Sequence, residues 1–163
     1  MIIGNFFKQI KPEYKKHKFT GLSFDSLKCK KGDIFFAING TVIDGNKFIS
    51  HAIQKGARTI ISSQEFEGIK KNILYIKSPN VRKLLSKVSY TLYKSKPKNI
   101  IAVTGTNGKS SIADFYFQIL KLNKVKVASI GTLGIKKGNY VKSVSNTTID
   151  SIKLSKVLNE LKK

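Results

Sequence analysis

The sequence predicts an α/β fold, because short apolar segments with the spacing of strands alternate with segments that have the spacing of amphipathic helices. A second observation is the continuous apolar run at 100–103, followed by a glycine-containing turn and a helical pattern. Such a run is typical of a parallel strand that is buried on both faces. The third is a polar, proline-containing segment at 94–99, which reads as a linker. We therefore expect two α/β parts, at 1–95 and 96–163.

The first part contains four predicted strands and two predicted helices. Short runs rich in β-branched and aromatic residues predict strands at 22–24, 33–38, 58–61 and 73–76. A helix is predicted from Asn46 to Gly56, where the glycine acts as the stop signal. A longer amphipathic helix is predicted by apolar residues at helical spacing, namely Val81, Leu84, Leu85, Val88 and Leu92.

The second part is expected to open as β-α-β-α. The apolar run at 100–103 gives the first strand, and 125–130 gives the second. The helix between them is predicted from one apolar face, formed by Ile112, Phe115, Tyr116, Ile119 and Leu120. A final helix is expected over 151–163. Two strands are fewer than a parallel sheet normally has, so this part is expected to be the incomplete start of a larger domain.

Composition narrows the class of protein. The chain of 163 residues has 31 Lys and Arg against 9 Asp and Glu, a net charge of +22, which attracts polyanions. The lysines are spread along the whole chain and only Arg58 and Arg82 are arginines, so we expect no specific nucleic-acid partner. The single Cys29 excludes an internal disulfide. With no signal peptide and no apolar run near about 20 residues, we expect a cytoplasmic protein without a membrane partner.

The segment that carries chemistry is the loop Thr104–Ser111, which lies between the predicted strand and helix. Glycines let a loop turn tightly and present N–H groups to phosphate oxygens, and the helix N-terminus adds partial positive charge. Lys109 is expected to reach the β- and γ-phosphates of ATP, and the Ser110 hydroxyl to bind Mg²⁺. The competing interpretation is a glycine turn with a surface lysine. We expect ATP to be held by Gly105, Thr106, Asn107, Gly108, Lys109, Ser110 and Ser111.

The same loop, T-G-T-N-G-K-S-S, resembles the ATP loop of the Mur ligases, which form amide bonds in peptidoglycan assembly at the expense of ATP. The folyl-polyglutamate synthetases have a similar loop, so the loop alone leaves both branches open. Segments 23–26, 32–40 and 44–49 resemble the N-terminal substrate domain pattern of the Mur ligases, D-S-R…G-D-L-F-x-A-x-x-G…D-G-x-x-F-I.

Two later segments point to one branch of the family. Residues 130–134 and 146–150 resemble the G-T-L-G and N-T-T-P-D motifs of the MurE type, to which the MurF type is less similar. The resemblance implies the N-terminal part of a monomeric ligase that adds a third amino acid to UDP-N-acetylmuramoyl-L-alanyl-D-glutamate. It implies a UDP-substrate domain at 1–95 and the start of the central ATP-binding domain at 96–163. It does not indicate which amino acid is added.

By the same resemblance, Lys109 is the catalytic residue and the substrate is bound by eight further residues. The uridine end is expected near Phe24, Ser26, Thr41, Val42 and Ile43, and the rest of the substrate near Asn146, Thr147 and Thr148. Without the family pattern, Asn146–Thr148 also suits a capping loop before the last helix. Two positions depart from the pattern: Leu27 stands where the family has Arg, and Ile149 stands where it has Pro.

The 163 residues lack a metal-binding acid at the end of a predicted buried strand. The family's metal-binding glutamate, modified lysine and amino-acid-recognition motif have no counterpart in them. We therefore expect these residues alone to form no product. The alternatives are a stand-alone nucleotide-binding module without ligase activity, and a fragment of a MurF-type ligase.

Overall fold

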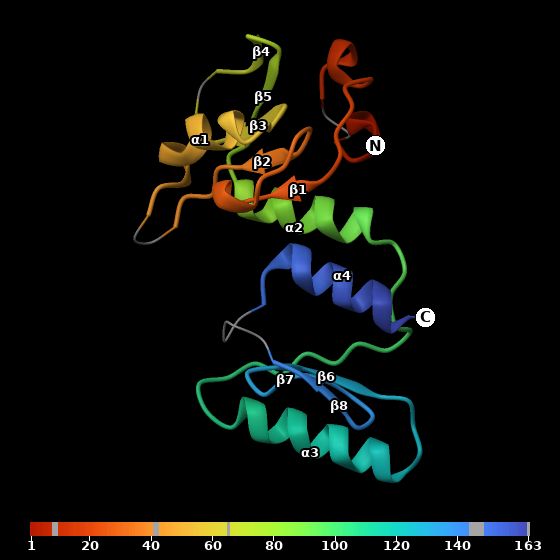
Figure 1. Ribbon diagram of the computed structural model, residues 1–163. Helices are drawn as coiled ribbons and strands as arrows, with labels where there is room; N and C mark the ends of the chain where they lie inside the picture. Colours follow the sequence, from red (N-terminus) through yellow and green to blue (C-terminus); the bar gives the residue numbers. More distant parts are fainter. Residues whose placement is uncertain (8–9, 41–42, 65, 144–148, 163) are drawn as a thin grey trace. The chain divides into compact units, whose positions relative to one another are not determined.

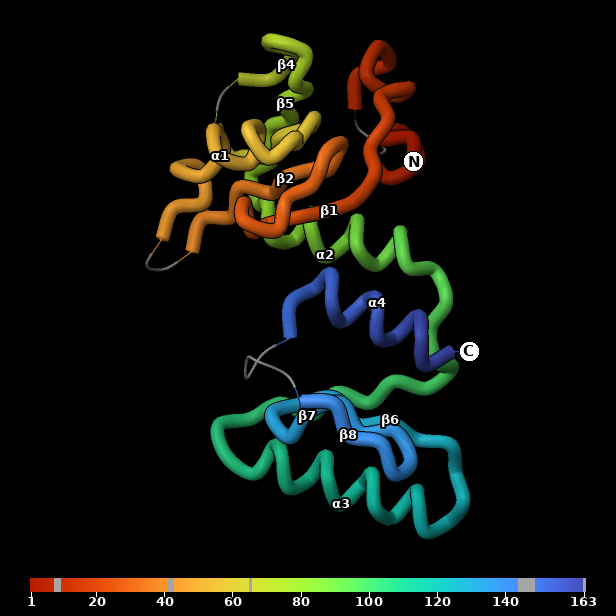
Figure 2. The backbone as a smooth tube through the Cα atoms, viewed as in Figure 1, coloured from red at the N-terminus to blue at the C-terminus, as the bar shows by residue number. Residues whose placement is uncertain are grey.

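The computed structural model describes residues 1–7, 10–40, 43–64, 66–143 and 149–162. The chain divides into two compact units, Met1–Leu92 and Tyr93–Lys163, which are described separately (Figure 1). Figure 2 traces the backbone of each unit. Both combine helices with strands, so the predicted α/β class is confirmed.

The first unit is built on a five-stranded sheet with the order β1-β2-β3-β5-β4. Strands β1 (Leu22–Ser23), β2 (Ile34–Phe36), β3 (Thr59–Ser62) and β5 (Ile73–Lys77) are parallel. All four predicted strands are therefore confirmed, with somewhat different bounds. Strand β4 (Gly68–Lys70) pairs antiparallel with β5 and was not predicted. It is joined to β5 by a two-residue turn in which Lys71 and Asn72 have positive φ.

Helical segments flank this sheet. The predicted helix at 46–56 forms as a 3₁₀ turn, Gly45–Phe48, followed by α1 (Ile49–Gln54). Helix α2 (Val81–Leu92) is confirmed at its predicted position. Shorter 3₁₀ turns are Ile3–Asn5, Pro12–Tyr14 and Ser26–Lys28. The central strands β2 and β3 are buried along their whole length, as a parallel sheet covered on both faces requires.

The second unit consists of α3 (Lys109–Leu122), β6 (Ala128–Gly131), β7 (Gly134–Lys137), β8 (Tyr140–Lys142) and α4 (Ser151–Leu161). The strands form an antiparallel meander in the order β6-β7-β8, and α3 packs against β6 (Figure 1). The predicted last helix is confirmed, and the Asp150 carboxylate caps it by accepting a hydrogen bond from the Lys153 N–H at 2.8 Å.

Three expectations for this unit were wrong. Residues 100–103 form no strand, and Ile100 and Ile101 are exposed. The strand expected at 125–130 begins only at Ala128 and pairs antiparallel. The helix predicted between the two strands is confirmed as α3, but the apolar face that predicted it is mostly exposed, and the buried residue of α3, Phe117, lies outside that face. The physical reason is that a strand needs hydrogen-bonding neighbours, and the described strands of this unit bond to one another.

Candidate functional site

The phosphate loop predicted at 104–111 leads directly into α3 in the second unit. Gly105 has φ 149° and Gly108 has φ 73°, conformations that disfavour any residue with a Cβ atom. Gly108 is the N-cap of α3, and a Cβ placed there meets no atom within 4 Å. The loop is exposed along its length. The sequence therefore folds here into an open, glycine-shaped turn at a helix N-terminus.

The first turn of α3 offers unpaired backbone donors. The first intrahelical hydrogen bond runs from the Ile112 N–H to the Gly108 carbonyl, at 2.9 Å. Gly108 has no side chain, and no side chain caps the helix. The N–H groups of Lys109, Ser110 and Ser111 thus lie where helices leave donors free, at the positive end of the helix dipole. This arrangement suits a phosphate group.

The Lys109 side chain folds back over the loop. Its ammonium group donates hydrogen bonds to the carbonyl oxygens of Gly105 and Thr106, the latter at 2.8 Å. An ammonium group has three donors, so one more is available to a ligand oxygen. The lysine therefore both closes the loop and places a full positive charge above it.

Ser110 is positioned by a residue that sequence reasoning missed. Its Oγ lies 2.8 Å from the Thr132 Oγ1, in the turn between β6 and β7. Thr132 belongs to the G-T-L-G segment, and the sequence pattern does not indicate a role for its hydroxyl. Only packing of the meander on α3 brings residues 22 positions apart into contact. The pair gives two neutral oxygens beside the loop, a ligand type that Mg²⁺ accepts.

Asp114 and Lys136 anchor α3 to β7. Their side chains form an ion pair at 2.5 Å, and Gln118 donates a second hydrogen bond to the carboxylate at 2.7 Å. The hydrogen bond from Lys136, followed by that from Gln118, holds the pKa of Asp114 below its ordinary value. The Asp114 carboxylate therefore serves to hold α3 against β7. Across the described residues, no cluster of three His, Cys, Asp or Glu side chains is suited to hold a metal ion.

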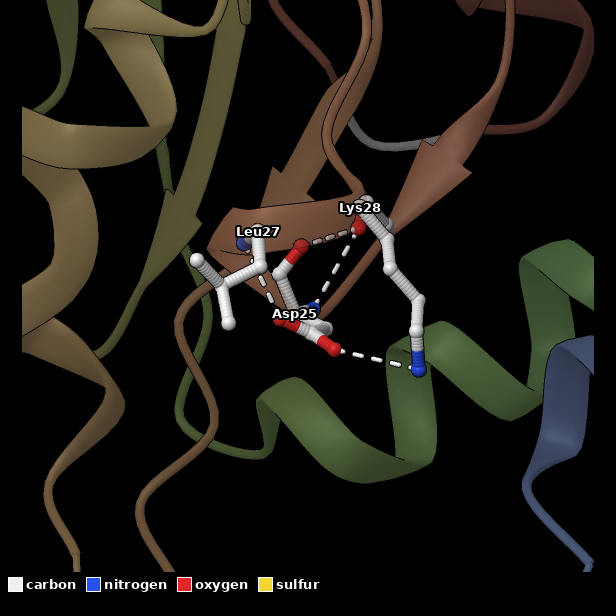
Figure 3. A network of polar contacts seen from close by, with 4 residues as sticks. Asp25, Leu27 and Lys28 are labelled. Atoms are coloured by element: carbon white, nitrogen blue, oxygen red, sulfur yellow. Dashed lines mark hydrogen bonds and ion pairs between the residues drawn. The ribbon is translucent and has the colours of Figure 1, made fainter.

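The predicted uridine site lies in the first unit, after the carboxyl end of β1 (Figure 3). The Asp25 carboxylate accepts a hydrogen bond from the Leu27 N–H at 3.0 Å and pairs with the Lys28 ammonium at 3.2 Å. The Ser23 hydroxyl donates to the Asp25 carbonyl at 2.7 Å. These bonds hold the 3₁₀ turn Ser26–Lys28, and they leave the Leu27 side chain 75% exposed.

Ser26 is 6% exposed, and its Oγ lies 3.0 Å from the Nδ1 of His51 on α1. This contact ties the turn to the helix and gives His51 a partner that sequence reasoning did not find. Phe24, which follows β1, and Ile43 are exposed and offer apolar surface. Cys29 is buried, and burial raises the pKa of its thiol to about 11, so the thiol is protonated at neutral pH.

Five predicted substrate residues lie outside the described residues: Thr41, Val42, Asn146, Thr147 and Thr148. The described part of the chain contains no helix that is both long and apolar enough to cross a membrane.

Comparison with known proteins gives two family matches. The model described as "Mur ligase family, catalytic domain" matches residues 18–93, and that described as "Mur ligase middle domain" matches residues 103–163. Relatives named UDP-N-acetylmuramoyl-L-alanyl-D-glutamate–2,6-diaminopimelate ligase include those of Rickettsia montanensis and Clostridioides difficile. The former is 38% identical over 93% of this chain and 32% of its own length, and the latter is 40% identical over 87% and 29%.

A solved structure of a ligase with the same name is 27% identical, with a TM-score of 0.79 over 99% of this chain and 33% of that one. The MurF ligase of Thermotoga maritima, solved with ADP, is 24% identical with a TM-score of 0.50, over 68% of this chain and 24% of that one. This second likeness bears on the fold alone. The chain spans about a third of the length of the curated relatives it matches.

Proposed function

The chain belongs to the Mur ligase family, and we propose that it provides the ATP loop and the uridine-binding part of an ATP-dependent ligase. The proposed reaction adds an amino acid to UDP-N-acetylmuramoyl-L-alanyl-D-glutamate, as the names of its relatives state for them. The observation that supports it most is the glycine-shaped loop at the α3 N-terminus, with the Lys109 ammonium folded over it. The proposed division is a substrate domain at 1–95 and the start of an ATP-binding domain at 96–163.

In the proposed reaction, the substrate carboxylate attacks the γ-phosphorus of ATP and releases ADP. The amine of the incoming amino acid then attacks the acyl carbon and releases phosphate, which leaves an amide. Mg²⁺ bound with ATP supplies charge neutralisation at the phosphates. Lys109 adds a cation at the same oxygens, and the amides of Gly105–Ser111 orient them. Ser110 is the proposed protein ligand of Mg²⁺, and Thr132 positions it.

The uridine end of the substrate is proposed to bind at the carboxyl ends of β1 and β2. Phe24 offers a ring to the base, and Ser26, Thr41, Val42 and Ile43 are the other residues proposed to contact the uridine end. Asn146, Thr147 and Thr148 are proposed to reach the remainder of the substrate. We also propose that the protein acts as a monomer in the cytoplasm, in keeping with its family.

The ATP assignment is tested with Lys109→Ala. Loss of a charge-assisted hydrogen bond is expected to weaken Mg-ATP binding by roughly 1.5–3 kcal/mol, measured by calorimetry on the full 163-residue chain. Lys126→Ala is the matched control, because Lys126 is an exposed lysine of the same unit outside the loop. Equal affinities of the two variants would remove Lys109 from the site.

The uridine assignment is tested by NMR titration with UDP. Amide shifts are expected at Ser26 and at Thr41–Ile43, together with a change at His51, whose ring contacts the Ser26 hydroxyl. Shifts confined to Gly105–Ser111 would show generic phosphate capture and contradict the assignment. The two outcomes are separable, because the two sets of residues belong to different units.

A further inference from the structure

A basic hollow lies in the first unit, at the amino ends of β2, β3 and β5. Its volume is about 640 Å³, and five of its ten lining residues are cations: Lys31, Lys55, Arg58, Lys70 and Lys71. The chain as a whole has 31 Lys and Arg in 163 residues. Cations are thus more than twice as frequent around the hollow as along the chain, so even spreading of lysines does not account for it.

No acid offsets this charge at the hollow. Its lining contains no Asp or Glu, and within the described ranges none of the five cations forms an ion pair. All five side chains are exposed. At the end of α1, the carbonyls of His51, Ile53 and Ala52 already accept hydrogen bonds from the N–H groups of Lys55, Gly56 and Ala57.

The cations come from four segments whose backbones the sheet holds in place. The Gly32 N–H donates to the Gly56 carbonyl at 2.7 Å, which joins the segment before β2 to the end of α1. Arg58 is held on both sides, since its N–H donates to the Asp33 carbonyl at 3.1 Å and its carbonyl accepts from the Leu74 N–H at 3.0 Å. Lys70 and Lys71 stand at the tight β4–β5 turn.

Part of the lining is apolar. Ile53, Ile73 and Tyr75 line the hollow between the cations, and the Tyr75 ring packs edge-on against Phe66 with centroids 5.5 Å apart. The hollow also lies at the opposite end of the parallel strands from Ser26, which follows the carboxyl end of β1. It is therefore separate from the proposed uridine site.

We propose that this hollow is a second anion site, which binds a small molecule carrying two or more linked phosphate groups. Several converging cations without a carboxylate favour a multiply charged ligand over a single carboxylate or chloride. The fixed backbone spacing and the limited volume of the hollow favour a compact ligand over an extended strand of nucleic acid, which shares the same phosphate chemistry.

The test is an NMR titration of the full chain with inorganic tripolyphosphate, without metal. Amide shifts are expected at Gly56, Arg58 and Ile73, in addition to any at Gly105–Ser111. In the double variant Arg58→Gln/Lys70→Gln, the affinity for tripolyphosphate measured from the shifts at these positions of the hollow is expected to fall by at least about tenfold. Lys83→Gln/Lys87→Gln on α2 is the matched control, because it removes the same charge from exposed positions of the same unit.

If both double variants weaken tripolyphosphate binding equally, the effect is due to net charge and the proposal is overturned. So would an absence of shifts around the hollow, whatever happens at Gly105–Ser111. An eight-nucleotide oligothymidine separates the two phosphate sources. Weaker binding of the oligonucleotide than of tripolyphosphate at the hollow supports the proposal, whereas tighter binding that Arg58→Gln/Lys70→Gln abolishes would assign the surface to nucleic acid instead.

Discussion

The two units differ in how far their apolar side chains are buried. In the first unit, β2 and β3 are buried throughout, and Ile34, Phe36, Ile60 and Ile61 have no exposed surface. In the second unit, most large apolar side chains of α3 and of the segment before the loop are exposed, and Leu122 is 82% exposed. Apolar sequence alone therefore does not make a core, because burial needs elements on both sides of a segment.

The difference also separates the two candidate sites. Ser26 is buried against His51 within a sheet-based unit, whereas the loop Thr104–Ser111 is exposed and is held mainly by its own lysine and by Thr132. The contact with α1 therefore supports the turn that holds Ser26. The loop owes its shape to glycine conformations and to a helix end, which are local features.

The largest expected effect is on the core of the first unit. Phe36→Ala is expected to lower the free energy of unfolding of that unit by about 3–5 kcal/mol, because Phe36 is fully buried. Leu122→Ala, on the exposed face of α3, is expected to change that of the second unit by less than about 0.5 kcal/mol. Urea titration followed by NMR peaks of each unit measures both. Comparable losses would contradict the contrast between the units.

A smaller effect is expected from glycines with positive φ. In Gly56→Ala the new Cβ would lie 2.7 Å from the Lys31 Cα, with φ at +105°, so we expect a loss of about 2–3 kcal/mol. Gly108→Ala meets no atom within 4 Å and is expected to cost only about 1 kcal/mol, from its φ of +73°. The same urea titration compares them. A larger cost at Gly108 would show that the loop is more tightly packed than its contacts indicate.

The smallest expected effects concern pH. Burial lowers the pKa of His17 below its ordinary 6.5, so unfolding favours its protonation. Its contribution to the stability of the first unit is complete above pH 6.5 and is lost as the pH falls through the lower native pKa. His17→Gln should flatten the change in unfolding free energy measured between pH 8 and pH 5. If His17→Gln leaves the slope of the unfolding free energy against pH unchanged, other groups cause that slope.

The corresponding group of the second unit is Asp114, whose pKa is lowered from 3.8 chiefly by its hydrogen bond from Lys136. Its contribution is therefore present above pH 3.8 and is lost as the pH falls through the lower native value. Asp114→Asn should reduce the loss of unfolding free energy of the second unit at acid pH, and it should leave the pH dependence of the first unit unchanged. Urea titration at several pH values measures both. An equal effect on both units would contradict the assignment.

Much of the first unit and the position of the loop were determined by local sequence. Short runs of β-branched and aromatic residues located its parallel strands, and helical apolar spacing located α2. The stop at Gly56 was correct because glycine tolerates the φ of +105° there. The glycine loop before α3 could likewise be predicted from the sequence, because its conformation depends on its own residues.

Tertiary structure decided what depends on partners. Ile100–Val103 has the composition of a buried strand, yet a strand exists only where a neighbour supplies its hydrogen bonds. The contacts Ser26–His51 and Ser110–Thr132 join residues 25 and 22 positions apart, which no local pattern brings together. The basic hollow gathers cations from four segments, and only the register of β2, β3 and β5 places them around one space.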